Sequence, residues 1–188
     1  MVEIVPYKPE WPKEFERLSA RLRAAMGDLA LRIDHIGSTS VPGLASKDRI
    51  DVQITVADFE AETLAGIVRV GYTIAPGIAS DHQPPGDTRP ISEWEKRYFR
   101  APDGERATNT HVRNLGRANW RYALLFRDYL RVHPAAAGAY GELKRRLAAL
   151  VDDSGVYADT KDPACDLIYV AAEAWAAQTG WRPKPSDA

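Results

Sequence analysis

A glycine–serine pair and an acidic residue form the part of this sequence whose residue types and spacing suggest chemistry. Gly37 and Ser38 end an apolar stretch, and twelve residues separate Ser38 from Asp51 in the run Ile50-Asp51-Val52-Gln53-Ile54. A Gly-Ser pair after a strand exposes backbone N–H groups that can approach a phosphate. A carboxylate that points out of the next strand can hold Mg²⁺ against that phosphate. The pattern predicts a site for a phosphorylated ligand, with Asp51 as the metal ligand and Mg²⁺ as the cofactor.

Three further side chains are candidates for the same site. Lys47 precedes the strand that carries Asp51, and it either reaches a phosphate or is an ordinary exposed lysine. Gln53 lies two residues after Asp51, so it is either a ligand contact or part of a plain polar face. His111 is a candidate general base or metal ligand, although Mg²⁺ prefers oxygen ligands. Asp51 and His111 are the candidate catalytic residues.

Positive charge is concentrated in one part of the chain. The 25 Lys and Arg residues nearly balance the 26 Asp and Glu residues, which argues against bulk nucleic-acid binding. Residues 96–146, however, carry twelve basic and four acidic side chains. Forked guanidinium groups suit phosphate, so the arginines of this segment either form an anion clamp or cover separate solvated faces. The arginines concerned are Arg97, Arg113, Arg117, Arg121, Arg127 and Arg131, and Arg113 and Arg127 are the preferred ligand contacts.

Hydrophobic periodicity and turn residues predict the elements that position these side chains. Helices are predicted over 10–26, 59–70, 117–132 and 135–151, and Pro163 is predicted to open a last helix that ends near Gly180. Strands are predicted over 31–36, 50–56, 72–74, 95–100 and 110–115. Residues 75–90 hold four prolines and two glycines and are predicted to form a surface loop. The helix over 135–151 carries a predicted apolar stripe of Ala136, Tyr140, Leu143, Leu147 and Leu150.

This order of elements predicts an α+β fold, in which helices pack against a small mixed sheet. We expect one compact unit, with a mixed core over 1–116 and a helical part over 117–188. The 188 residues are 45% apolar and 27% charged, which excludes a mainly disordered chain. Alternation in 50–56 places Asp51, Gln53 and Thr55 together on one strand face.

The cellular setting is predicted from what the sequence lacks. Cys165 is the single cysteine, so an internal disulfide and a cysteine-based zinc site are excluded, which suits a reducing compartment. The N-terminal residues do not have the pattern of a signal peptide. No apolar stretch approaches the roughly 20 residues that a membrane helix needs. These features predict a cytoplasmic protein without a membrane association.

Several segments resemble the GrpB family, also called UPF0157. They are DHIGSTSVPGLASK at 34–47, IDVQ at 50–53, THVR at 110–113 and FRDYLR at 126–131, together with Tyr157 and Lys161. The resemblance covers roughly residues 5–178. It implies a nucleotidyltransferase-like core with a helical C-terminal part. It also implies a link to dephospho-CoA kinases, because related domains are fused to those enzymes.

The sequence departs from the nucleotidyltransferase pattern at position 53. That pattern has a second carboxylate two residues after the first, whereas Gln53 offers one neutral oxygen. Two-metal phosphoryl transfer needs several anionic oxygens around the pair of ions. A third carboxylate is expected from a later strand, with Glu93, Glu95 and Glu105 as candidates by position.

Three functions follow as alternatives. The first is a nucleotide-binding transferase, whose phosphates rest on Gly37 and Ser38 with Mg²⁺ on Asp51. The second is a non-catalytic binding or assembly module with a protein partner, for example a dephospho-CoA kinase. The third is a small-molecule enzyme that uses Asp51 and His111 as acid and base. The charge distribution favours a compact phosphorylated ligand.

Overall fold

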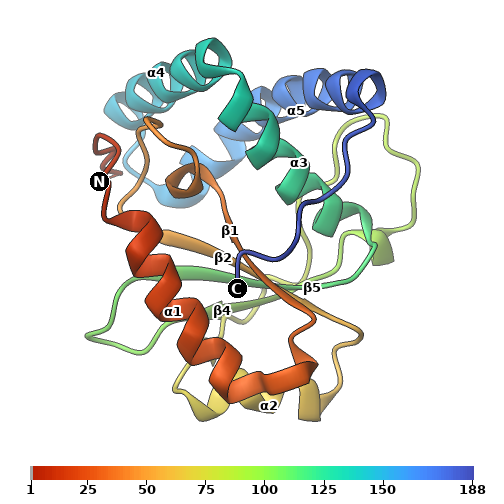
Figure 1. Cartoon of the computed structure of the whole chain (residues 1–188). Helices are drawn as coiled ribbons and strands as arrows, with labels where there is room; N and C mark the ends of the chain where they lie inside the picture. The colour runs from red at the N-terminus through yellow and green to blue at the C-terminus, as the bar shows by residue number, and fades with distance from the viewer. Residues whose placement is uncertain (1) are drawn as a thin grey trace.

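A five-stranded mixed sheet lies at the centre of the structure, a computed structural model that describes residues 2–188 (Figure 1). The strands are β1 (Arg32–Ile36), β2 (Ile50–Val56), β3 (Thr73–Ile74), β4 (Arg97–Arg100) and β5 (Thr108–Asn114). Their order across the sheet is β1-β2-β5-β4-β3. The central pair β2 and β5 is parallel, and the other neighbouring pairs are antiparallel. The predicted fold class, a small mixed sheet with flanking helices and a helical C-terminal part, is confirmed.

Different helices cover the two faces of the sheet (Figure 1). Ile50, Val52 and Val56 of β2 are fully buried in one core with residues of α1 (Trp11–Met26) and α2 (Ala61–Arg69). The alternate residues of β2 point the other way, where Thr55 accepts a hydrogen bond of 3.0 Å from Trp120 of α3 (Ala118–Val132). The period-two pattern of this strand is therefore confirmed, and its polar face is turned toward the C-terminal helices.

The C-terminal helices depart from the prediction at two points. The last helix, α5 (Ser154–Thr179), begins nine residues before Pro163, which lies inside it. The predicted start is wrong because Asp153 caps the helix, accepting hydrogen bonds from the backbone N–H groups of Gly155 and Val156.

The predicted apolar stripe of α4 (Pro134–Leu150) is confirmed only at its N-terminal end, where Tyr140 is buried and Ala136 packs against the same core cluster. Leu143 and Leu150 are 38% and 83% exposed, and the other buried residues of this helix are Ala137, Gly141 and Lys144. The helix therefore turns a lysine inward, toward the connection between β1 and β2. Apolar periodicity cannot predict a buried lysine, because the groups that bind its ammonium lie on other elements of the fold.

The segment before β4 is anchored to the sheet. Backbone N–H groups of Asp81 and Lys96 donate to the carbonyls of Trp94 and Ala79, at 2.8 and 2.9 Å. The predicted loop over 75–90 thus continues the β4 edge for a short distance. This pairing fixes the position of Asp81 beside the polar face of β5.

Across residues 2–188, the structure contains no helix with both the length and the apolar character needed to cross a membrane.

Candidate functional site

A cavity of about 440 Å³ lies between the polar face of the sheet and the C-terminal helices. Its volume falls within the range of pockets that hold small ligands. Its walls come from the β1–β2 connection, from β2 and β5, from the segment before β4, and from α3, α4 and α5. Of the eight site residues predicted from the sequence, six line it: Gly37, Ser38, Lys47, Asp51, His111 and Arg113.

The turn after β1 approaches Asp51 closely. Gly37 has a φ of 66°, and a Cβ at this position would lie 2.3 Å from Oδ2 of Asp51. Only glycine avoids both the left-handed strain and this clash. The Ser40 hydroxyl donates to the Gly37 carbonyl at 2.6 Å and holds the turn. Ser38 is thereby presented to the cavity next to the Asp51 carboxyl group.

Lys144 of α4 reaches the same turn and was not predicted from the sequence. Its Nζ donates to Ser38 Oγ at 2.7 Å and to the Ala45 carbonyl. Burial, together with the positive charge of Lys161, lowers the pKa of Lys144 to about 7. The side chain therefore lacks enough negative charge around it, and a bound anion would restore its full protonation.

Two more lysines stand at this end of the cavity. Nζ of Lys47 lies 4.4 Å from the centre of the Tyr157 ring, and Lys47 forms no ion pair with any carboxylate in residues 2–188. Burial lowers its pKa, and the charges of Lys161 and Arg49 add to the effect. Lys161 of α5 places its Nζ 3.1 Å from Sγ of Cys165. Positive charge thus converges on this end from three separate elements.

Asp51 is half-buried, and its environment does not fit a two-metal centre. Asn109 donates from Nδ2 to Asp51 Oδ1 at 2.7 Å. Burial raises the pKa of Asp51, although Asn109 and Lys144 act in the opposite direction. Within residues 2–188 there is no cluster of three or more His, Cys, Asp or Glu side chains that could hold a metal ion. One carboxylate among lysines is a poor donor set for divalent cations.

Asp81 defines the other end of the cavity. It accepts from Arg113 Nε at 2.8 Å, from Lys96 Nζ at 2.6 Å and from Asn119 Nδ2 at 3.0 Å. Burial alone would raise the pKa of Asp81, but the charges of Arg113 and Lys96 hold it well below its ordinary value. Glu93, Glu95 and Glu105 do not line the cavity, and Glu93 and Glu105 pair instead with Arg117 and Arg21.

His111 lies between the two ends and is half-buried. Burial, reinforced by Arg113 and Lys96, lowers its pKa well below the ordinary value of histidine. Its Nδ1 lies 3.3 Å from Nη2 of Arg113, which donates to it. The imidazole is therefore neutral, with its proton on Nε2. A ring with so low a pKa is a weak base.

Gln53 is separated from the cavity by Arg113. Its Oε1 accepts from Arg113 Nη1 at 2.6 Å, and its Nε2 donates to the Trp120 carbonyl at 3.4 Å. Position 53, where a second carboxylate would stand in a transferase, therefore supports the arginine that binds Asp81. A neutral amide performs this role without a further buried charge.

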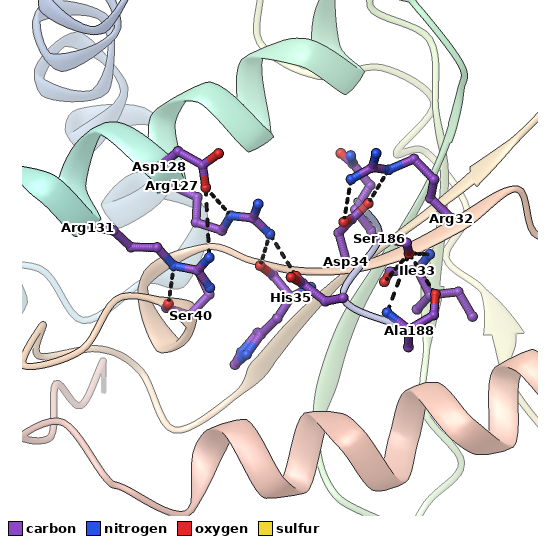
Figure 2. A network of polar contacts seen from close by, with 12 residues as sticks. Arg32, Ile33, Asp34, His35, Ser40, Arg127, Asp128, Arg131, Ser186 and Ala188 are labelled. Carbon is purple, nitrogen blue, oxygen red and sulfur yellow. Dashed lines mark hydrogen bonds and ion pairs between the residues drawn. The ribbon is translucent and has the colours of Figure 1, made fainter. Parts of the chain in front are cut away.

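Arg127 lies in a separate network along β1 (Figure 2). Its guanidinium donates to the His35 carbonyl at 3.0 Å, to Asp128 at 2.8 Å and to Asp187 at 2.7 Å. It does not line the cavity, and neither do Arg97, Arg117, Arg121 and Arg131. Of the proposed arginine clamp, the structure brings only Arg113 to the cavity.

The charged side chains that line the cavity are six basic and three acidic. They are Lys47, Arg49, Lys96, Arg113, Lys144 and Lys161, with Asp51, Asp81 and Asp162. A low-dielectric cavity with one sign of charge in excess attracts ligands of the opposite sign.

Alternation along β5 places Asn109 beside His111 and Arg113 on one face, and this signal could have identified Asn109. No local signal marks Asp81 or Lys144.

The fold and the cavity define a small mixed α/β domain with a cavity in which basic side chains outnumber acidic ones. The chain belongs to the GrpB family, since the family model described as GrpB protein matches residues 1–170. A UPF0157 protein of Halalkalibacterium halodurans is 36% identical over 78% of this chain and 69% of its own length. A protein of Mycolicibacterium paratuberculosis named dephospho-CoA kinase is 38% identical over 97% of this chain. The chain spans about half the length of that relative, 48%.

One solved structure agrees with the family assignment. The crystal structure of conserved protein GrpB from Enterococcus faecalis superposes with a TM-score of 0.74 and 29% identity, covering 92% of this chain and 99% of that one. The structure of Cid1 in complex with its short product ApU gives a TM-score of 0.47 and 11% identity over 75% of this chain. A likeness at that level carries no argument about function.

Proposed function

We propose that this chain binds a phosphorylated small molecule, a nucleotide in the first instance, with its phosphates at the Ser38 end of the cavity. The observation that carries the proposal is the contact between Lys144 Nζ and Ser38 Oγ, 2.7 Å long, inside a cavity with six basic and three acidic side chains. Lysine ammonium groups and serine hydroxyls are common phosphate donors. A phosphate at this point would contact both at once.

The state of the lysines supports the same function. The pKa of Lys144 falls to about 7 because of burial and the charge of Lys161, and the pKa of Lys47 is lowered for the same reasons. Buried charges without enough opposite charge are costly to the free protein. The folded protein already contains this unfavourable charge, so an anion that neutralises the lysines relieves it and binds more tightly as a result. Such depressed lysine pKa values cluster at functional sites.

We propose that the lysines, rather than Mg²⁺, neutralise the bound phosphate. Asp51 is the carboxylate that lies beside Gly37, and the basic side chains around it would repel a divalent cation. Nucleotidyl transfer through two metal ions would need a larger set of carboxylates. The proposed function is therefore recognition of the phosphorylated ligand, without a metal-dependent transfer step.

Calorimetric titration tests this proposal. Inorganic tripolyphosphate and ATP are titrated into the native protein, each with and without Mg²⁺, and into the variants Lys144→Met and Lys13→Met. We expect micromolar to millimolar binding that Lys144→Met weakens at least tenfold, and that Lys13→Met, on the exposed side of α1, leaves unchanged. No heat from either ligand at millimolar concentration would overturn it. An absolute requirement for Mg²⁺ would overturn the role of the lysines.

A second candidate function is assembly with a dephospho-CoA kinase. The observation that favours it is that relatives carrying this name match nearly all of this chain within 48% of their own length. Interfaces between domains of one chain resemble transient protein–protein interfaces, so the same kind of contact can form between separate chains. Co-elution with a purified dephospho-CoA kinase in size-exclusion chromatography tests it. Independent elution of the two proteins at about 50 µM, a concentration high enough to detect a weak complex, would count against it.

A further inference from the structure

Two buried polar atoms at the Asp81 end of the cavity have no hydrogen-bond partner within residues 2–188. They are Nε1 of Trp94 and Oδ1 of Asn119, and both side chains line the cavity at 1% exposure. Bulk water does not reach either atom. A buried donor or acceptor without a partner is rare in folded proteins and costly when it occurs. Two such atoms in one cavity wall point to a partner that is not part of the chain.

The orientation of the Asn119 amide is fixed by its own contacts. Nδ2 donates to Asp81 Oδ2 at 3.0 Å and to the Glu95 carbonyl at 2.9 Å. Both of its hydrogens are therefore used, and a flipped amide would direct an oxygen at two acceptors. Oδ1 must be the free acceptor. Since the indole N–H of Trp94 can only donate, the wall offers one donor and one acceptor.

Aromatic side chains lie beside the two atoms. The rings of Trp94 and Tyr122 meet edge to face with centroids 6.1 Å apart, and Phe126 also lines the cavity. Aromatic walls that carry a few fixed polar groups are typical of sites for planar ligands. Phosphate is less favoured at this end, because Lys96 and Arg113 are already paired with Asp81.

The two ends of the cavity are separated by a distance that suits a nucleotide. Asn109 contacts Asp51 at one end, and Arg113 contacts Asp81 at the other. Both lie on one face of β5, four residues apart, which corresponds to about 13 Å along the strand. A ligand that spans this distance can place phosphates at Ser38 and a planar group near Trp94.

We propose that the Trp94 and Asn119 end of the cavity is a second subsite, which binds a planar heteroaromatic group presenting one hydrogen-bond donor and one acceptor, as the edge of a nucleobase does. The donor of the ligand pairs with Asn119 Oδ1, and its acceptor pairs with Trp94 Nε1–H. Because both atoms are enclosed, ligand entry shifts the side chains around them. The inference rests on the proposed phosphate site, and it adds the chemical class of the remaining part of the ligand.

The test compares ligands that share phosphates and differ in the base. Inorganic tripolyphosphate, the four common nucleosides and the corresponding nucleoside triphosphates are titrated calorimetrically into the native protein and the variants Trp94→Phe and Trp175→Phe. Trp94→Phe removes the N–H but keeps an aromatic ring, and Trp175, outside the cavity, is the matched control. We expect at least one nucleotide to bind tenfold or more tighter than tripolyphosphate. Trp94→Phe should remove that gain, leaving tripolyphosphate affinity unchanged.

The outcomes separate the two proposals. If tripolyphosphate binds and no nucleotide binds more tightly, the planar subsite is wrong and the phosphate site stands. If nucleosides bind and tripolyphosphate does not, the phosphate site is wrong and the subsite stands. The affinities of tripolyphosphate and the nucleotides are compared in the native protein, without a variant. The proposal can therefore be refuted even if Trp94→Phe does not fold. Equal loss of affinity for tripolyphosphate and nucleotide in Trp94→Phe would also overturn it.

Discussion

Two buried arginines, Arg113 in the cavity and Arg127 beside β1, stand in opposite electrostatic surroundings. Near Arg127 the charges balance, because Arg32, Arg127 and Arg131 face Asp34, Asp128 and Asp187. Figure 2 shows how this network closes on itself and on backbone carbonyls of β1 and the turn that follows. Around Arg113 basic side chains outnumber acidic ones, and Trp94 Nε1 and Asn119 Oδ1 have no hydrogen-bond partner in the part of the chain that the structure describes.

This difference explains why one arginine belongs to the frame of the protein and the other to its candidate site. In a fully paired network every charge already has a partner inside the protein, so the network stabilises the structure around it. A network with excess positive charge and unpaired polar atoms favours binding of an anion and of hydrogen-bonding groups. Burial of an arginine therefore does not by itself indicate ligand binding. The indicator is the positive charge that stays unpaired after all ion pairs within the protein are counted.

The largest expected effect concerns the closed network. Arg127→Met leaves Asp128 and Asp187 without their main partner, and breaking a buried ion pair in this way costs about 3–5 kcal/mol. We expect that loss in the free energy of unfolding by urea denaturation. Tripolyphosphate affinity should stay unchanged at temperatures where the variant is folded. The control is Arg145→Met. The side chain of Arg145 on α4 is 51% exposed, so this substitution should lower the free energy of unfolding by less than about 0.5 kcal/mol. A selective loss of affinity in Arg127→Met would place this arginine in the site.

The next largest effect concerns the turn at the phosphate end. Gly37→Ala adds a Cβ that would lie 2.3 Å from Asp51 Oδ2, in a residue with φ of 66°. Backbone strain and the clash together should cost about 2–4 kcal/mol, and displacement of Ser38 should weaken tripolyphosphate binding.

The matched control for the turn is Gly43→Ala. Gly43 has a φ of 79°, but its Cβ would meet no atom within 4 Å. The control therefore carries the backbone strain alone, about 1 kcal/mol, and should bind tripolyphosphate normally. Equal effects of the two substitutions on unfolding and binding would show that close approach to Asp51 is irrelevant.

The sequence was informative where the signal is local. Alternation in 50–56 identified β2 and the face that carries Asp51, and the glycine–serine turn lies within the same short segment. The start of α5 was missed because Pro163 resembles a first-turn proline, whereas the capping by Asp153 occurs ten residues earlier. A proline inside a helix costs a hydrogen bond but does not forbid the helix.

Residues that owe their place to distant segments were missed. Lys144 lies 106 residues from Ser38, and Asp81 lies 32 residues from Arg113. Neither stands in a pattern, because one faces inward from a helix and the other sits in a proline-rich loop. Arg127 resembled Arg113 in the sequence, and only the packing of α3 against β1 distinguishes the two. Charge pairing across the fold cannot be inferred from neighbours along the chain.

The smallest of these effects is a pH dependence that distinguishes the two regions. Lys144 has a pKa of about 7, so a ligand that needs its ammonium form binds less well as the pH rises above 7. We expect tripolyphosphate affinity to fall about tenfold per pH unit between 7.5 and 8.5 in the native protein. Lys144→Met should lack this component, and the difference between the two proteins cancels the titration of the ligand itself. Arg127→Met should retain the full dependence.

The same pKa predicts an opposite effect on the ligand-free protein. Between pH 7 and about 10.5, Lys144 holds a proton in the unfolded chain and has lost it in the folded one. The unfolded state then binds more protons, so the contribution of Lys144 to the free energy of unfolding rises with pH. Urea denaturation of the native protein and Lys144→Met at pH 7 and 9 measures that difference. Ligand affinity and intrinsic stability should therefore change in opposite directions over this range, and a parallel change would contradict the assignment of the charge to Lys144.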